Sequence, residues 1–136
     1  MFFNISNHPA HVEKSTWSAE QIAEAMTLGG DVVDIPFPTV TPEMSDEQIA
    51  DEARDVAVAV AFAAGTHLAG EKSAAMVAGE YVTTIRIIAD LQKLGIPCYF
   101  GQSNRVAEER VEDGKVVVVH KFVFAGFRKV PDIEVK

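Results

Sequence analysis

The alternation of short apolar runs with amphipathic segments is the feature that most limits the fold of this chain. Apolar runs predict strands at residues 2–6, 32–35, 74–79 and 96–101, and a helical segment follows each of the first three. Strands that alternate with helices form a parallel sheet with the helices on its faces, joined by right-handed crossovers. We therefore expect an α/β fold, a Rossmann-like three-layer sandwich with a mostly parallel sheet.

The starts of the first two helices carry a specific signal. Ser18 with Gln21, and Ser45 with Gln48, have the spacing of a capping box, in which two residues exchange hydrogen bonds across the first turn. The first helix is expected to end at the glycines of "LGG", the second near residue 64, and a third to span residues 80–95.

The C-terminal part of the chain predicts two strands with no helix between them. Residues 106–111 and 115–127 are rich in apolar residues, and "EDGK" between them is typical of a tight turn. These segments predict an antiparallel hairpin added to one edge of the sheet. With 136 residues and no linker-like segment, the chain is expected to form one domain over residues 1–136.

Composition excludes several classes of partner. Twelve Lys and Arg residues against twenty Asp and Glu residues give a net charge of −8, which opposes non-specific binding to long nucleic acid. A small phosphorylated ligand remains compatible, since backbone N–H groups can hold it. The single cysteine, Cys98, fits a reducing compartment. Without a long apolar run or a signal-peptide pattern, we expect a cytoplasmic protein with no membrane partner.

Polar residues gather where the predicted strands end, and ligands of open α/β sheets bind at the carboxyl ends of strands. The first strand runs into "NISNHP", the second into the apolar "PFP", the third into "GE" before a Thr-rich helix, and the fourth into "GQSNR". The candidate site residues are Asn4, Ser6, Asn7, His8, Gly79, Glu80, Thr83, Ser103, Asn104 and Arg105.

A purely structural role stays open for each cluster. Asn, Ser and Gly populate ordinary loops because they cap helices and tolerate left-handed backbone. Glu80 is placed to interact with the positive end of its helix, and His8 can be a surface residue. Arg105 can be a solvated cation beside Glu108 and Glu109.

Several familiar chemistries have no motif in this chain. It contains no GxGxxG fingerprint, no Walker P-loop and no GxSxG elbow. Its four histidines have no metal-site spacing with Cys98 or with carboxylates, so no metal or cofactor is expected. A pocket of hydrogen-bonding groups with one cation suits a phosphate-bearing ligand, whose own hydroxyl could act as nucleophile.

The motifs "NISNHP", "DIPFP", "VAGE", "GIPCYFGQSNR" and "FVFAGFRKV", in this order from Phe2 to about Arg128, resemble a family of small stand-alone CRISPR-associated Rossmann-like proteins. That group includes sensors of the second messenger cyclic oligoadenylate, and ring nucleases that cleave it. The resemblance implies a homodimer with the ligand over its two-fold axis. It also implies metal-independent cleavage, in which a ribose 2′-hydroxyl attacks the adjacent phosphate.

Carried over by position, the resemblance implies that the loop from Asn4 to His8 contacts the ring. Gly79, Glu80 and Thr83 would then line the pocket, and Ser103 to Arg105 would hold phosphate. Two positions depart from the family pattern. Ala78 replaces a larger residue, and Gln102-Ser103-Asn104 replaces a Ser/Thr-rich run, which leaves cleavage and ring size open.

Three hypotheses follow. The first is a dimeric ring nuclease with His8, Arg105 and Glu80 as catalytic residues, His8 acting as general acid or base and Arg105 stabilising phosphate charge. The second is a non-catalytic cyclic-nucleotide-binding module, a sponge or sensor. The third is an assembly protein without ligand, whose apolar strand "VVVVHKFVFAGF" is its dimer or partner surface.

Overall fold

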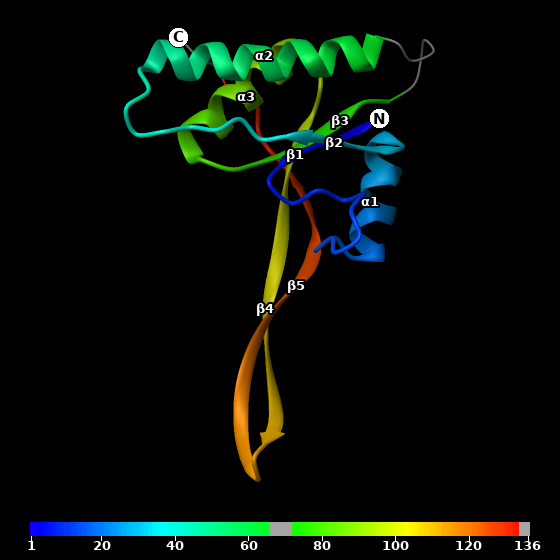
Figure 1. The fold of residues 1–136 in the computed structure, drawn as a ribbon. Coiled ribbons are helices and arrows are strands. Elements are labelled where there is room, and N and C mark those ends of the chain that lie inside the picture. Colours follow the sequence, from blue (N-terminus) through cyan, green and yellow to red (C-terminus); the bar gives the residue numbers. More distant parts are fainter. Residues whose placement is uncertain (66–71, 134–136) are drawn as a thin grey trace.

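The computed structural model describes residues 1–65 and 72–133, and it has the α/β fold expected from the sequence. The sheet order is β2-β1-β3-β4-β5, with β1 to β4 parallel and β5 antiparallel to β4 (Figure 1). Residues 65–73, whose sequence "GTHLAGEKS" predicts a loop between the second helix and the third strand, lie mostly outside the described residues. The elements are β1 (Phe2–Ser6), α1 (Ala19–Gly29), β2 (Val32–Pro36), α2 (Asp46–Gly65), β3 (Ala74–Ala78), α3 (Tyr81–Lys93), β4 (Cys98–Glu112) and β5 (Lys115–Lys129).

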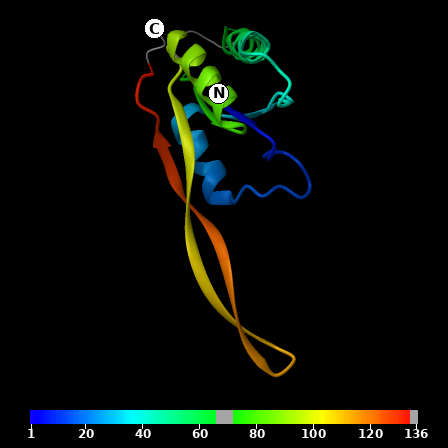
Figure 2. The ribbon, with the colours of Figure 1, turned by 90° about the vertical axis from the view of Figure 1, so that its left-hand side faces the viewer.

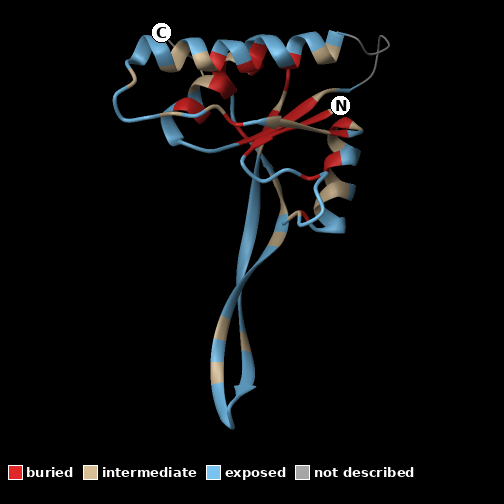
Figure 3. Cartoon of the chain, viewed as in Figure 1, coloured by how far each residue is buried: buried red, intermediate tan, exposed pale blue. Residues whose placement is uncertain are grey.

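The sheet separates two apolar cores, which makes the body three layers thick. Phe3 and Ile5 of β1 pack in the core beneath α2 and α3, whereas Phe2 packs on the opposite face with Ala25 of α1. Buried residues concentrate in the centre of the sheet and on the helix faces turned toward it (Figure 3). Within the described residues, no helix is long and apolar enough to span a membrane.

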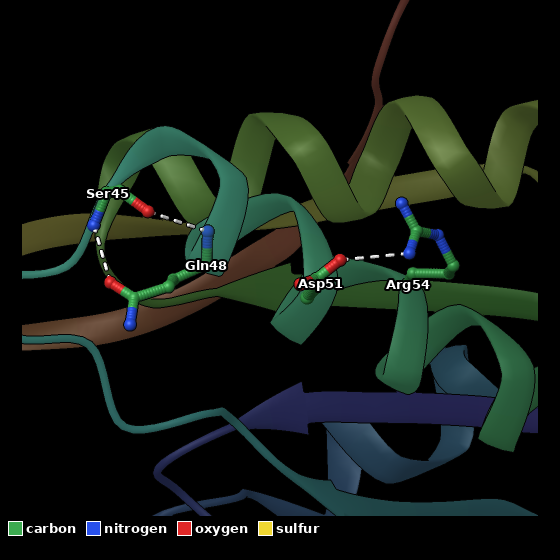
Figure 4. Close-up of polar contacts among 4 residues, drawn as sticks. All are labelled: Ser45, Gln48, Asp51 and Arg54. Carbon is green, nitrogen blue, oxygen red and sulfur yellow. Dashed lines mark hydrogen bonds and ion pairs between the residues drawn. The ribbon is translucent and has the colours of Figure 1, made fainter.

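The predicted capping box of α2 is confirmed with both of its hydrogen bonds, and at α1 the predicted Ser18 cap is confirmed. The backbone N–H of Ser45 donates to Gln48 Oε1 at 2.8 Å, and the N–H of Gln48 donates to Ser45 Oγ at 3.1 Å (Figure 4). At α1, Ser18 Oγ accepts from the N–H of Gln21 at 3.1 Å. These bonds satisfy amides that a helix start leaves without internal partners, so the helices begin where the sequence indicates.

The predicted hairpin is confirmed, but the fourth strand is longer than expected. The segments 96–101 and 106–111 belong to one strand, β4, which pairs with β5 from Tyr99–Lys129 to Glu112–Lys115. Because β5 supplies a pairing partner along this whole length, β4 does not end at the glycine of "GQSNR". Asp113 and Gly114 form the turn with φ angles of 50° and 74°, as a two-residue hairpin loop of this kind requires.

Most of the hairpin extends beyond the body. Strand β4 pairs with β3 at Cys98 and Tyr99 and then leaves the sheet. We call the paired segments 103–112 and 115–124 the arm, which Figures 1 and 2 show projecting away from the helices. A register shift at Gln102/Ser103 leaves Ala125 unpaired and marks the arm's root, where a bulge increases the local twist.

The capping box of α2 can be tested against an exposed ion pair on the same helix. Ser45→Ala removes one reciprocal bond and is expected to lower the free energy of unfolding by about 0.5–2 kcal/mol. The control, Arg54→Ala, breaks an exposed contact with Asp51 at 2.9 Å (Figure 4) and should cost at most about 0.5 kcal/mol. Urea unfolding followed by circular dichroism measures both. A larger loss for Arg54→Ala would contradict the assignment.

Candidate functional site

The polar side chains at the end of β1 are bonded to one another and to the loop that follows. Asn4 is 1% exposed, and its Nδ2 donates to the carbonyl oxygen of His8 and to Asp34 Oδ1, both at 2.9 Å. Its Oδ1 accepts from Ser6 Oγ at 2.7 Å. Both N–H groups of the Asn4 amide are therefore used inside the protein, where they hold the loop in place.

Asp34 of β2 completes this network, and sequence reasoning missed it. Its carboxylate accepts from the backbone N–H groups of Ala10 at 2.8 Å and His11 at 3.0 Å. Partial burial opposes ionisation, but these bonds, the Asn4 bond and the charge of His11 outweigh it and lower the pKa of Asp34. Asp34 is the first residue of the motif "DIPFP", and the parallel pairing of β2 with β1 sets it beside Asn4. A predicted register for these two strands would therefore have identified it.

His8 takes part in this network through its backbone. Its carbonyl oxygen accepts from Asn4 Nδ2 and from Trp17 Nε1, each at 2.9 Å, while the residue as a whole is exposed. The carbonyl group of His8 thus links the loop after β1 to β1 itself and to Trp17, which precedes the N-cap of α1.

The cluster after β3 also has a structural explanation. Glu80 caps α3, accepting from Thr83 Oγ1 at 2.6 Å and from the backbone N–H groups of Thr83 at 2.7 Å and Val82 at 3.1 Å. The hydrogen bond from the Thr83 side chain, then those from the two amides, lower the pKa of Glu80. A Cβ on Gly79 would lie 2.5 Å from the ring of Phe37, so glycine is required for this contact.

A cleft lies beside these clusters, between the start of α1, the end of β3 and the root of the arm. Its volume is about 610 Å³. Hydroxyl groups, apolar groups and aromatic rings share its surface, and Glu20 supplies the one charged side chain among the described lining residues. The lining residues are Thr16, Ser18, Ala19, Glu20, Gln21, Met76, Ala78, Gly101, Ser103, Phe122, Val123 and Phe124.

An aromatic cluster fixes the two walls of the cleft relative to each other. The ring of Phe127 in β5 lies 5.1 Å from that of Phe2, 6.0 Å from that of Trp17 and 5.0 Å from that of Phe124, measured between centroids. The backbone N–H of Phe127 donates to Glu24 Oε1 of α1 at 3.0 Å. These contacts hold the start of α1 and the root of the arm together.

The structure divides the predicted site residues into two groups. The pairing of Ser6 with Ala78 sets the residues after β1 next to Gly79 and Glu80 at the same edge of the sheet. Asn104 and Arg105 instead lie in the arm. Arg105 is six residues past Tyr99, roughly 20 Å along β4, and pairs with Phe122. Ser103 is the predicted residue that lines the cleft.

Comparison with known proteins yields a family and no described activity. A family model with the description "Uncharacterized protein MJ1673 family" matches residues 1–128. No curated protein and no solved structure matches the chain. The roles of the site residues are therefore argued from geometry.

The Asp34 network predicts a pH-dependent effect. The folded-state pKa lies below the ordinary value of 3.8, so the ionised carboxylate stabilises the fold above that pH, and this contribution is lost as pH falls through the folded-state pKa. Asp34→Asn is expected to destabilise the protein by about 1 kcal/mol or more at pH 7 and by less at pH 3. Urea unfolding at both pH values measures this difference. The control, Asp55→Asn on the exposed face of α2, should show no such trend; a loss for Asp34→Asn that stays constant with pH would refute the assignment.

Proposed function

The chain belongs to the MJ1673 family, and we propose that it binds a small nucleotide in the cleft beside α1. Cyclic oligoadenylate is the candidate ligand that the resemblance to CRISPR-associated proteins suggests. The observation that carries the proposal is a cleft at the carboxyl edge of the sheet that combines aromatic rings with hydroxyl groups and a helix start.

The position of the cleft supports a ligand site. The order β2-β1-β3 means that the chain leaves β1 toward one side of the sheet and later continues on the other. In open α/β sheets, the crevice at such a reversal, outside the carboxyl ends of the strands, is where ligands bind. Ala78 at the end of β3 and Ser18 at the start of α1 both line the cleft.

The chemistry of the lining suits a base and a phosphate at different ends. Phe122 and Phe124 offer rings on which a nucleobase can stack. The hydroxyl groups of Thr16 and Ser18, with the first-turn amides of α1, favour phosphate oxygens without a cation. Because Glu20 repels an anion, we place the phosphate on the Thr16 and Ser18 side.

Ring cleavage is the second candidate. The pairing of β1 with β3 favours cleavage, because it sets the residues after β1 beside those after β3. His8 then lies near the carboxyl edge of the sheet, where it could accept the proton of a ribose 2′-hydroxyl. The carboxylate of Glu80 is already engaged as a helix cap, and Arg105, although it pairs with Phe122, is not among the residues that line the cleft. Binding without cleavage therefore fits the geometry better.

A charge placed in the cleft tests the binding proposal. Ser103→Glu is expected to raise the Kd for cyclic tetra- or hexa-adenylate at least tenfold, about 1.4 kcal/mol, by repulsion of phosphate. Asn104→Glu is the matched control: it adds the same charge one residue along β4, on the opposite side of the strand, and should change Kd little. Isothermal titration calorimetry in EDTA measures both.

Recovery of the ligand after the same titrations distinguishes a binding module from a ring nuclease, because only the nuclease opens the ring. Intact ligand after incubation selects a binding module. Linear products that disappear in His8→Ala select the ring nuclease. If neither ring binds the unmodified protein, or if both Glu variants weaken binding equally, the proposed site is wrong.

A further inference from the structure

A groove runs between α2 and α3, on the face of the sheet opposite α1. Its first hollow, of about 340 Å³, lies between the α2 segment Ala50–Ala61 and the second half of α3. A second hollow, of about 350 Å³, extends past Ala64 and shares Ala61 and Leu94 with the first. The two hollows are therefore continuous, and we call them together the α2–α3 groove.

Large apolar side chains are exposed along this groove. Val58 and Leu94, which line the first hollow, are 60% and 51% exposed. Phe62 is 77% exposed and follows Val58 by four residues, so it lies on the same side of α2. Single exposed apolar residues are ordinary on a protein surface, but a patch of them beside charged residues marks an interaction site.

Positive charge gathers at the first hollow. Arg54, Arg86 and Lys93 line it together with one carboxylate, that of Asp90. Arg54 has only an exposed contact with Asp51, and neither Arg86 nor Lys93 forms an ion pair with a described residue. In the whole chain, acidic residues outnumber basic ones by twenty to twelve. The groove therefore has the opposite balance of charge, with cations beside an apolar surface.

We propose that the α2–α3 groove binds an acidic amphipathic helix of a partner protein. Helices that dock in grooves insert apolar side chains at positions i, i+3, i+4 and i+7, and the charged side chains beside them pair with the rim. From Ala50 to Ala64, α2 is roughly 20 Å long, enough for about four turns of a docked helix. The inference concerns a surface separate from the cleft and does not depend on nucleotide binding.

Charge favours such a helix over a lipid surface. The first turn of α2 carries Asp46 and Glu47, and both are exposed. These carboxylates would be repelled by an anionic membrane, which attracts clusters of Lys and Arg. Glutamates on a narrow helix can instead reach Arg86 and Lys93 while its apolar side contacts Val58 and Leu94.

Two peptides of opposite charge test the proposal on the full chain. The probe is a fluorescein-labelled peptide of about fourteen residues, with leucine in the i, i+3, i+4, i+7 pattern and glutamate at the flanking positions. A second peptide carries lysine in place of glutamate. Fluorescence anisotropy is expected to show at least tenfold tighter binding of the glutamate peptide. The double variant Arg86→Glu/Lys93→Glu should reverse this preference.

The control is Arg110→Glu/Lys115→Glu, which makes the same change in net charge on either side of the turn at the tip of the arm. It should keep the preference for the glutamate peptide. The proposal fails if neither peptide binds, if both bind equally well, or if the double variant and its control behave alike.

Filling the groove tests its apolar part without a change of charge. Ala61 lines both hollows, so Ala61→Trp is expected to weaken binding of the glutamate peptide at least tenfold. The matched control is Ala59→Trp, because Ala59 is exposed on α2 and lines neither hollow. It should bind as the unmodified protein does, and circular dichroism checks that both variants fold. An equal effect of the two substitutions would contradict docking in the groove.

Two further measurements distinguish other occupants. Co-sedimentation with vesicles of anionic phospholipid, if Arg86→Glu/Lys93→Glu abolished it, would assign the groove to a membrane. Self-association in sedimentation equilibrium, if the same variant abolished it, would assign the groove to a second copy of the chain. Either result would overturn the proposal, which predicts neither.

Discussion

The hydrogen bonds that Asn4 and Asp34 make with the loop after β1 are the constraint on which the rest of the site depends. Asp34 holds the amides of Ala10 and His11, Asn4 holds the carbonyl of His8, and that same carbonyl accepts from the indole of Trp17. A buried amide and a half-buried carboxylate without these partners would cost more than the bonds themselves contribute, so the loop has one favourable path. That path delivers Trp17 to the aromatic cluster and sets where α1 begins.

The position of Trp17 in turn determines how the two walls of the cleft are placed. Trp17 packs against Phe127, and Glu24 of α1 accepts from the Phe127 amide, so the start of the helix and the root of the arm are held together. The bulge at the root then turns the hairpin away from the body. Phe122 of β5 lines the cleft, so the hairpin supplies part of one of its walls.

Local signals were sufficient to predict much of the fold. The Ser45–Gln48 capping box and the Asp-Gly turn each require residues close in sequence, and both are present as expected. The path of β4 was mispredicted because it depends on pairing with β5, which the residues around the glycine of "GQSNR" do not reveal. The polar side chains at the end of β1 were predicted to bind a ligand because no partner for them is visible nearby in the sequence. Their partner, Asp34, lies 30 residues from Asn4. Ser103 was found, whereas Ser18 was predicted only as a helix cap and Thr16 was not singled out.

Hydrogen–deuterium exchange on Asn4→Ala, compared with the unmodified protein, tests most directly whether this network positions the cleft. If the network holds both walls, exchange should accelerate together at the amides of Ala10 and His11, in the first turn of α1 and at Phe127, while α2 and α3 keep their protection. Faster exchange confined to the loop, with α1 and Phe127 unchanged, would contradict the account.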